Sequence, residues 1–228
     1  MHSHDQPAHK YPPPPTPEEL GLTPVVPAGV RRSGAALAKM KKFRFELLAA
    51  WIAGNFPPCR VADIGGGKGM LSYLLDREGF ECTVIDPVPQ PLPAKYREPG
   101  TGRQVKVPAG ACVRHVAKPY SAELAADFDL LVALHAHGVN HLILDSARAG
   151  GQGCVLLPCC VIGEPAAPPP GENWFGWLAG YGRGLGLAVE YFHLNFSGQN
   201  VGFYVRGARP DHAGARVGWP QTTRPGGA

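Results

Sequence analysis

"VADIGGGKGM", residues 61–70, decides the fold of this chain, because four glycines stand directly behind a short apolar run. Gly65, Gly67 and Gly69 alternate with other residues and follow Asp63, near the end of that run. Glycine adopts positive φ angles without strain and lets the backbone touch a ligand that a Cβ atom would push away. The stretch therefore predicts a strand, a ligand-binding turn and the start of a helix.

Strand-like and helical patterns alternate on both sides of this turn. Strands are expected at residues 59–64, 80–86, 111–116, 128–136 and 152–160, with a closing hairpin of two strands at 187–196 and 200–207. Helices are expected at 33–54, 68–79, 120–127, 139–151 and 171–186, and a long loop with one short turn at the proline-rich 87–110. This alternation predicts a mostly parallel, doubly wound α/β sheet covered by helices on both faces, with an antiparallel hairpin at its end.

Composition divides the 228 residues into one domain and two tails. Residues 1–30 are rich in proline and histidine and are predicted to form a disordered tail, and 207–228 a flexible basic tail. Residues 31–206 form the predicted domain, and the hydrophobic content of 44% over the whole chain is enough for a sizeable core. The net charge of +4 is compatible with a nucleic-acid partner without requiring one.

The cysteines and the apolar segments predict where the protein works. Its six cysteines lack the spacing of a disulfide scaffold, and the N-terminus lacks the apolar segment of a secretory signal. No apolar stretch is long enough to span a bilayer. We therefore expect a soluble cytoplasmic protein that does not bind membranes.

Asp86 ends the second predicted strand, where a carboxylate can accept hydrogen bonds from ribose hydroxyls. A dinucleotide and S-adenosylmethionine are the two cofactors that suit such a unit. The phosphate-binding pattern G-x-G-x-x-G is absent from the turn, and the charge of Asp63 would repel a pyrophosphate but attract an ammonium group. A glycine-rich turn without a ligand is the alternative, and the matched Asp86 argues against it. The residues favour S-adenosylmethionine.

These motifs resemble those of the class I S-adenosylmethionine-dependent methyltransferases. The resemblance rests on D-x-G-x-G-x-G after the first strand, an acidic residue ending the second strand, and the closing hairpin, and it covers about residues 35–206. It implies a seven-stranded Rossmann-like sheet and methyl transfer from S-adenosylmethionine. It also implies cofactor contacts from Asp63, Gly65, Gly67 and Gly69 to the methionine part, from Asp86 to the ribose, and from Ala117 and Lys118 to the adenine.

Histidines and cysteines end two further apolar runs, "LVALHAHG" (131–138) and "VLLPCC" (155–160). His135 or His137 could act as a general base or bind the methyl acceptor, and Cys159 or Cys160 could act as a nucleophile. All four side chains could also bind a metal, or be hydrogen-bonded and packed without a chemical role. We assign catalytic roles to His135, His137 and Cys160, and predict no metal ligand.

The same two motifs resemble a branch that contains the eukaryotic tRNA ribose 2′-O-methyltransferases. Members of that branch read roughly H-x-C-G after the fourth strand and end the fifth in Cys-Cys. This chain has His137 in place of the cysteine, and Asn140-His141 where Thr-Asp often follows. The resemblance implies RNA, most of all tRNA, as the substrate and a ribose hydroxyl or a base as the methyl acceptor. A methyltransferase for small molecules or proteins and a non-catalytic cofactor-binding module are the alternatives.

Basic and aromatic residues supply candidates for an RNA surface. The basic residues lie in the first predicted helix and at the C-terminal end: Arg31, Arg32, Lys39, Lys41, Lys42, Arg44, Arg206, Arg209, Arg216 and Arg224. They would neutralise phosphates or simply form solvated surfaces. Trp174, Trp177 and Tyr181 have helical spacing, which favours packing on the sheet over stacking on a base.

Overall fold

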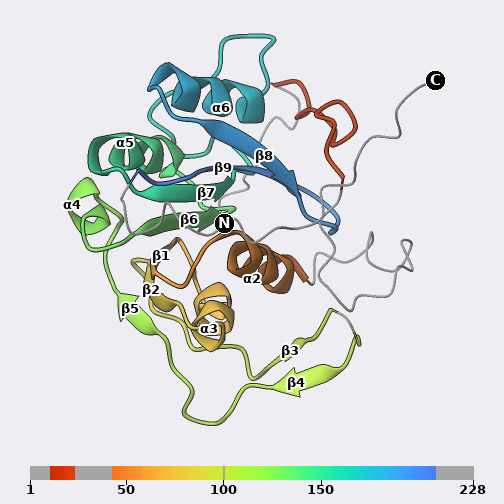
Figure 1. Cartoon of the computed structure of the whole chain (residues 1–228), viewed down its shortest axis with the longest axis vertical. Helices are drawn as coiled ribbons and strands as arrows, with labels where there is room; N and C mark the ends of the chain where they lie inside the picture. The colour runs from red at the N-terminus through yellow and green to blue at the C-terminus, as the bar shows by residue number, and fades with distance from the viewer. Residues whose placement is uncertain (1–10, 24–42, 100, 209–228) are drawn as a thin grey trace, which may run out of the picture.

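A single mixed sheet organises the molecule, as the sequence predicts (Figure 1). The computed structural model describes residues 11–23, 43–99 and 101–208. The seven-stranded sheet has the order β5-β2-β1-β6-β7-β9-β8. Its strands are β1 (Arg60–Ile64), β2 (Glu81–Ile85), β5 (Arg114–Val116), β6 (Leu130–Leu134), β7 (Gly153–Leu157), β8 (Val189–His193) and β9 (Val201–Val205).

The strand order reverses beside β1. The chain runs outward from β1 through β2 to β5, and then returns to the other side of β1 to form β6 and β7. All of these pairs are parallel, whereas β9 runs antiparallel to both β7 and β8. Ligands of doubly wound sheets bind beyond the carboxyl ends of the strands at such a reversal, which places the expected site next to residues 65–69.

Helices cover both faces of the sheet. They are α2 (Arg44–Asn55), α3 (Met70–Arg77), α4 (Ala122–Ala125), α5 (Asn140–Gly150) and α6 (Trp174–Gly184). Figure 1 shows α2 and α3 on one face and α4, α5 and α6 on the other. Two hydrophobic cores result, and the neighbouring residues Leu131 and Val132 of β6 belong to opposite cores, as the two-residue period of a strand requires.

Helix α2 is anchored to the end of the sheet by aromatic side chains. Trp51 stacks on Phe192 of β8 at 4.0 Å between ring centroids and contacts Tyr204 of β9 edge-on at 5.1 Å. The helix ends at Asn55, one residue beyond the predicted end at Gly54. The predicted helical segment 33–42 lies outside the described residues.

The predicted loop at 87–110 contains a second, two-stranded sheet, so that part of the prediction was wrong. β3 (Lys95–Arg97) pairs antiparallel with β4 (Gln104–Lys106). Tyr96 docks this hairpin edge-on against Tyr73 of α3 at 6.3 Å between ring centroids. Strands of three residues are too short to show an alternating pattern, which is why the surrounding prolines dominated the sequence signal.

Strand β7 ends at Leu157, three residues earlier than predicted. Proline has no N–H group for the ladder, so Pro158 ends the pairing. Cys159 and Cys160 therefore lie in the following loop, both half-buried, and neither belongs to the strand.

Parts of both predicted tails lie against the domain. Within residues 11–23, Leu20 and Leu22 pack against the core on the α4–α6 face, and the N–H of Ala208 donates to the carbonyl of Gly151 at 2.9 Å. The rest of the predicted tails, 1–10, 24–30 and 209–228, lies outside the described residues. None of the helices in the described part of the chain combines the length and apolar character that a bilayer-spanning segment requires.

Candidate cofactor and acceptor site

The glycine turn connects β1 to α3 in left-handed backbone conformations. Gly65, Gly67 and Gly69 have φ angles of 66°, 55° and 71°. The N–H of Gly65 donates to the carbonyl of Ile85 at 2.9 Å, and the N–H of Gly67 donates to Oδ2 of Asp86 at 3.0 Å. These bonds tie the turn to the end of β2, so its backbone is held in position before any ligand arrives.

Asp63 lies buried beneath this turn. It is 2% exposed, and its Oδ2 accepts a hydrogen bond from the Ser72 hydroxyl at 2.9 Å. A Cβ atom on Gly66 would lie 2.6 Å from the same oxygen, so only glycine fits there. Burial raises the pKa of Asp63 to about 6, against the hydrogen bond from Ser72 and with a smaller contribution from the charge of Asp86. A cationic partner would therefore stabilise the charged form of this buried carboxylate.

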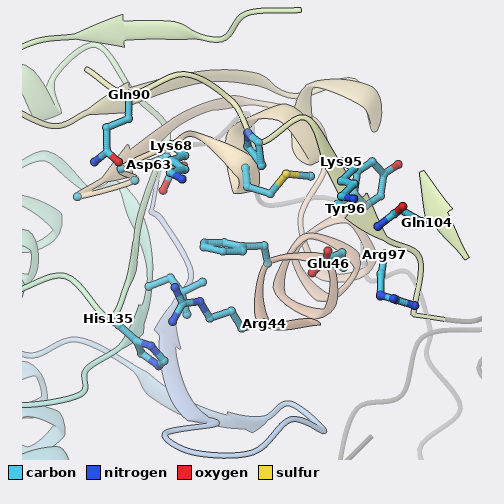
Figure 2. Close-up of a pocket in the computed structure, with 17 residues that line it drawn as sticks. Arg44, Glu46, Asp63, Lys68, Gln90, Lys95, Tyr96, Arg97, Gln104 and His135 are labelled. Atoms are coloured by element: carbon cyan, nitrogen blue, oxygen red, sulfur yellow. The ribbon is translucent and has the colours of Figure 1, made fainter. Parts of the chain in front are cut away.

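A cavity of about 710 Å³ opens beside the turn, within the range of small-molecule sites (Figure 2). It has three walls. The glycine turn contributes Asp63, Gly65, Gly66, Gly67 and Lys68; α2 and its neighbourhood contribute Arg44, Phe45, Glu46 and His135; and the hairpin side contributes Gln90, Lys95, Tyr96, Arg97 and Gln104. The β3–β4 hairpin, which the sequence did not predict, thus forms one side of the site.

Cations outnumber acids in the cavity lining. Arg44, Lys68, Lys95 and Arg97 line it, against the carboxyl groups of Asp63 and Glu46. Lys95 and Arg97 are exposed on the hairpin, on the side of Figure 2 opposite Asp63. The arrangement is suited to a ligand whose anionic part faces the hairpin.

Glu46 is a functional candidate that the sequence analysis missed. Its side chain reaches the cavity from α2, the residue is 8% exposed, and Oε2 has no hydrogen-bond partner. Burial raises the pKa of Glu46 to about 7, against a backbone hydrogen bond. The sequence contained one indication of its burial: Glu46 is three residues from both Phe43 and Ala49, which are buried, and this spacing predicts the same helix face.

His135 follows β6 in a conformation that residues other than glycine rarely adopt. Its φ of 57° is the only positive value among the described residues that are not glycine. Its Nε2 donates to the carbonyl of Gln199 at 2.8 Å, which requires the proton on that nitrogen. His135 lines both the main cavity and a neighbouring cavity of about 170 Å³ that Cys159 also lines. Strained backbone of this kind is concentrated at functional sites.

Some of the predicted cofactor-binding residues lie outside the cavity lining. Both carboxylate oxygens of Asp86 accept backbone N–H groups, from Gly67 and Val88. Gly69 is buried, and a Cβ atom there would lie 2.6 Å from a methyl group of Val113. Ala117 is exposed after β5. Asp86 and Gly69 therefore support the turn from behind, and direct contact of these residues with a cofactor stays a prediction.

The predicted catalytic residues separate into two places. His135 lines the cavity, whereas His137 and Cys160 are outside its lining, and their ligating atoms and that of Cys159 are within 4.8 Å of one another. Burial, followed by the neighbouring Cys160, raises the pKa of Cys159 to about 12. Cys159 is therefore a thiol at neutral pH, which is a poor state for a nucleophile.

Two of the predicted basic RNA-binding residues fall within the described part of the chain, and the others lie outside it. Arg44 lines the cavity, whereas Arg206 follows β9 and lies near Glu190 of the edge strand β8. Trp174, Trp177 and Tyr181 surround His141 with ring centroids 4.9 to 5.6 Å away. The three rings pack in or against the hydrophobic core on the α4–α6 face, with Trp174 buried and Trp177 and Tyr181 half-buried. The ring that they contact belongs to α5, whereas the sequence predicts packing on the sheet.

Comparisons with known proteins found no matching family model and no matching curated protein. Among solved structures, an O-methyltransferase family protein from Burkholderia thailandensis is 13% identical, with a TM-score of 0.43, over 71% of this chain and 55% of that one. The S-adenosylmethionine-dependent methyltransferase SibL is 15% identical, with a TM-score of 0.44, over 72% and 55%. The 1,6-didemethyltoxoflavin-N1-methyltransferase of Burkholderia thailandensis, solved with S-adenosylhomocysteine, is 16% identical, with a TM-score of 0.39, over 79% and 78%.

The chain spans 55% of the length of the first two of these proteins. Likenesses of this degree say nothing about cofactor or substrate, so we base the function on the geometry of the site.

Proposed function

We propose that this protein is an S-adenosylmethionine-dependent methyltransferase. The single observation that carries the proposal is the buried Asp63 carboxylate beneath a glycine turn that lines a cavity at the reversal of strand order. The residues fit this cofactor. Gly65 and Gly67 offer bare backbone to the cavity, and Asp63 offers a negative charge to the ammonium of a methionine moiety.

A dinucleotide fits less well. The N–H of Gly67, which a pyrophosphate would need, is already donated to Asp86. Asp63 and Asp86 place two carboxylates at the turn, and both repel phosphate. Asp86 can still bind the ribose of the cofactor, because a carboxylate oxygen that accepts one backbone N–H group can also accept a hydrogen bond from a ribose hydroxyl.

When bound, S-adenosylmethionine supplies an electrophilic methyl group on its sulfonium. The residues of this chain would then hold the acceptor in line and take its proton. Glu46 is the better candidate for the base, because it lines the cavity, its buried Oε2 has no hydrogen-bond partner and its raised pKa lies near neutrality. His135 already donates Nε2–H to Gln199, which suits it to positioning the acceptor side of the cavity.

For the acceptor we propose RNA, with tRNA as the first class to test. Four cationic side chains line the cavity, and two of them, Lys95 and Arg97, lie exposed on the hairpin where a phosphate backbone could approach. The resemblance of the "LHAHG" and "LPCC" motifs to tRNA ribose methyltransferases points the same way. A small anionic molecule is the second candidate, favoured by a cavity volume of about 710 Å³, which is within the range of small-molecule sites. The six free cysteines suit a reducing cytoplasm.

Calorimetry with S-adenosylmethionine, S-adenosylhomocysteine and NAD⁺ tests the cofactor. We expect binding of the first two and none of NAD⁺, and the reverse order would refute the assignment. Incubation with radioactive methyl donor and, separately, total RNA, protein and small metabolites then identifies the acceptor. Label in the RNA fraction supports RNA, label in the metabolite fraction supports the second candidate, and binding without label in any fraction would indicate a non-catalytic module.

A further inference from the structure

Three metal-ligating side chains meet outside the lining of the main cavity, on two loops that are separated in sequence. His137 follows β6, and Cys159 and Cys160 follow β7. One ligating atom from each lies within 4.8 Å of the other two, and the two sulfur atoms are 3.6 Å apart. Two ligands of one tetrahedral zinc ion, at bond lengths of 2.0 to 2.3 Å, lie about 3.5 to 3.8 Å apart. The sulfur pair already has that spacing.

The two loops are fixed against each other, so the three ligands do not meet by chance. Gly138 and Gly163 both have positive φ, and a Cβ atom on Gly138 would lie 2.9 Å from the carbonyl oxygen of Gly163. The backbones of the two loops thus pack directly on one another, one residue beyond His137 and three beyond Cys160.

The buried carboxylate of Glu164 also holds the loop after β7 against the start of α5. Glu164 accepts hydrogen bonds from the backbone N–H groups of Asn140 and His141 at 3.0 and 3.3 Å, and it pairs with Nδ1 of His141 at 2.9 Å. On the other side of the three ligands, the thiol of Cys159 donates to the carbonyl of His135 at 3.8 Å and joins the same two loops. His137, Cys159 and Cys160 therefore lie between two sets of hydrogen bonds that join the loops. The three side chains need little reorganisation to bind an ion.

We propose that His137, Cys159 and Cys160 bind a divalent zinc-class metal ion and leave its fourth position open to water or a substrate atom. Two thiolates and a neutral imidazole balance the charge of Zn²⁺, which suits the half-buried position of the sulfur atoms. His137 is exposed, so the ion has a route in from solvent. No further histidine, cysteine or carboxylate joins the group within the described residues, which makes it a three-ligand site.

The position of the ion gives it access to the candidate active site. Cys159 lines the cavity of about 170 Å³, together with Arg44 and His135, and those two residues also line the main cavity. A three-ligand zinc site with an open position is the type that polarises bound oxygen or sulfur atoms. This site is a departure from the sequence-based prediction of no metal ligand, and it stands whether or not the main cavity binds S-adenosylmethionine.

The test is cobalt and zinc binding to the full, untagged chain under reducing conditions. We expect about one equivalent of Zn²⁺ by elemental analysis, and a Co²⁺ form with the near-ultraviolet charge-transfer band of thiolate ligands. This band separates the proposed site from imidazole-only binding by His2, His4 or His9 in the N-terminal sequence. A Co²⁺ spectrum without a thiolate band would overturn the proposal.

Variants locate the ion. Cys159→Ser, Cys160→Ser and His137→Ala should each weaken Co²⁺ binding by about tenfold or more, because each removes one ligand. Cys112→Ser is the matched control, since Cys112 is a free, exposed cysteine outside the group. Unchanged affinity in the three variants, or an equal loss in Cys112→Ser, would contradict the site. The visible bands of the Co²⁺ form should shift when a small thiol is added, and a spectrum that saturating thiol leaves unchanged would refute the open position.

Discussion

Asp63 and Gly66 are in direct contact: a Cβ atom on Gly66 would lie 2.6 Å from the Asp63 carboxylate. The acidic residue and the glycine turn of the motif are therefore one packing unit, in which the side chain of Asp63 fills the space that the missing side chain of Gly66 leaves. The glycines of this turn are needed for two separate reasons. Gly65, Gly67 and Gly69 have positive φ angles, whereas at Gly66 the carboxylate itself excludes a side chain.

Replacement of Gly66 by alanine should therefore disrupt the turn. We expect Gly66→Ala to lower the affinity for S-adenosylmethionine by at least about tenfold and to destabilise the fold by about 1–3 kcal/mol, since the methyl group must displace a buried carboxylate. Calorimetry and thermal unfolding measure the two effects. Gly180→Ala is the matched control, because a Cβ atom on Gly180 in α6 would meet no other atom within 4 Å and the residue should tolerate the change. Equal behaviour of the two variants would contradict this packing.

The raised pKa of Asp63 predicts a pH dependence of stability. The folded-state pKa of about 6 lies above the ordinary value for an aspartate, so the folded protein binds this proton more tightly than the unfolded chain. Its contribution to the free energy of unfolding should fall as the pH rises from about 4 to about 6, by an amount on the order of 3 kcal/mol. Urea unfolding of the wild type and Asp63→Asn across this range measures it. A slope that Asp63→Asn leaves intact would assign the proton to another group.

The proposed contact between the same carboxyl group and the cofactor predicts that cofactor affinity depends on pH. An ammonium group binds the ionised form of Asp63, so the affinity for S-adenosylmethionine should rise about tenfold between pH 5 and pH 7 and level off above that. Calorimetry at several pH values in the wild type and in Asp63→Asn gives the two profiles. A flat wild-type profile would remove Asp63 from the cofactor contact while leaving its packing role untouched.

Much of this architecture can be predicted from the sequence, because the signals are local. The apolar run of β1, the glycine turn and the start of α3 are contiguous, so the strand, turn and helix of residues 60–77 follow from one motif. The burial of Asp63 was not predicted, because it depends on the packing around the turn. The hairpin at 95–106 could not be predicted, since its docking depends on Tyr96 meeting Tyr73 across the fold. Glu46 was missed for the same reason: its lack of a partner is a property of the assembled cavity.

The grouping of His137 with Cys159 and Cys160 could be predicted only in part from the sequence. Adjacent parallel strands place the ends of β6 and β7 together, which sequence alone indicates. The sequence does not show which of the two histidines joins the cysteines, and no residue pattern predicts the left-handed conformation of His135. The structure separates His135, which lines the cavity, from His137, which joins the cysteines.

Glu46→Gln should reduce turnover without weakening cofactor binding. The amide keeps the shape of the side chain but cannot take a proton, so kcat should fall about a hundredfold or more at pH 8 while the Kd for S-adenosylmethionine stays unchanged. In the wild type, kcat should rise through pH 7 as Glu46 ionises. Equal losses in kcat and cofactor affinity would make Glu46 a binding residue instead of a base.

The pH dependence of stability provides a second test with the same variant, Glu46→Gln. Because burial raises the pKa of Glu46 to about 7, its ionisation opposes folding, and wild-type stability should decline as the pH rises from about 5 to about 7. Glu46→Gln should abolish that decline and leave the protein at least as stable as the wild type above pH 7. A variant that is less stable at pH 8 would show that the carboxylate has a partner when it is charged.

The hairpin cations distinguish an extended anionic acceptor from a compact one. Lys95 and Arg97 line the cavity, whereas Arg103 and Lys106 lie exposed on the same hairpin outside the lining. If the acceptor is RNA, Lys95→Ala combined with Arg97→Ala should weaken RNA binding strongly and lower the slope of log affinity against log salt by about 2. The pair Arg103→Ala and Lys106→Ala is the matched control and should have a smaller effect, because phosphates held in the cavity do not meet those residues. Filter binding across a salt series measures both. If the two double variants lose the same affinity, the cations act only through the overall charge of the hairpin, and the cavity then favours a small acceptor.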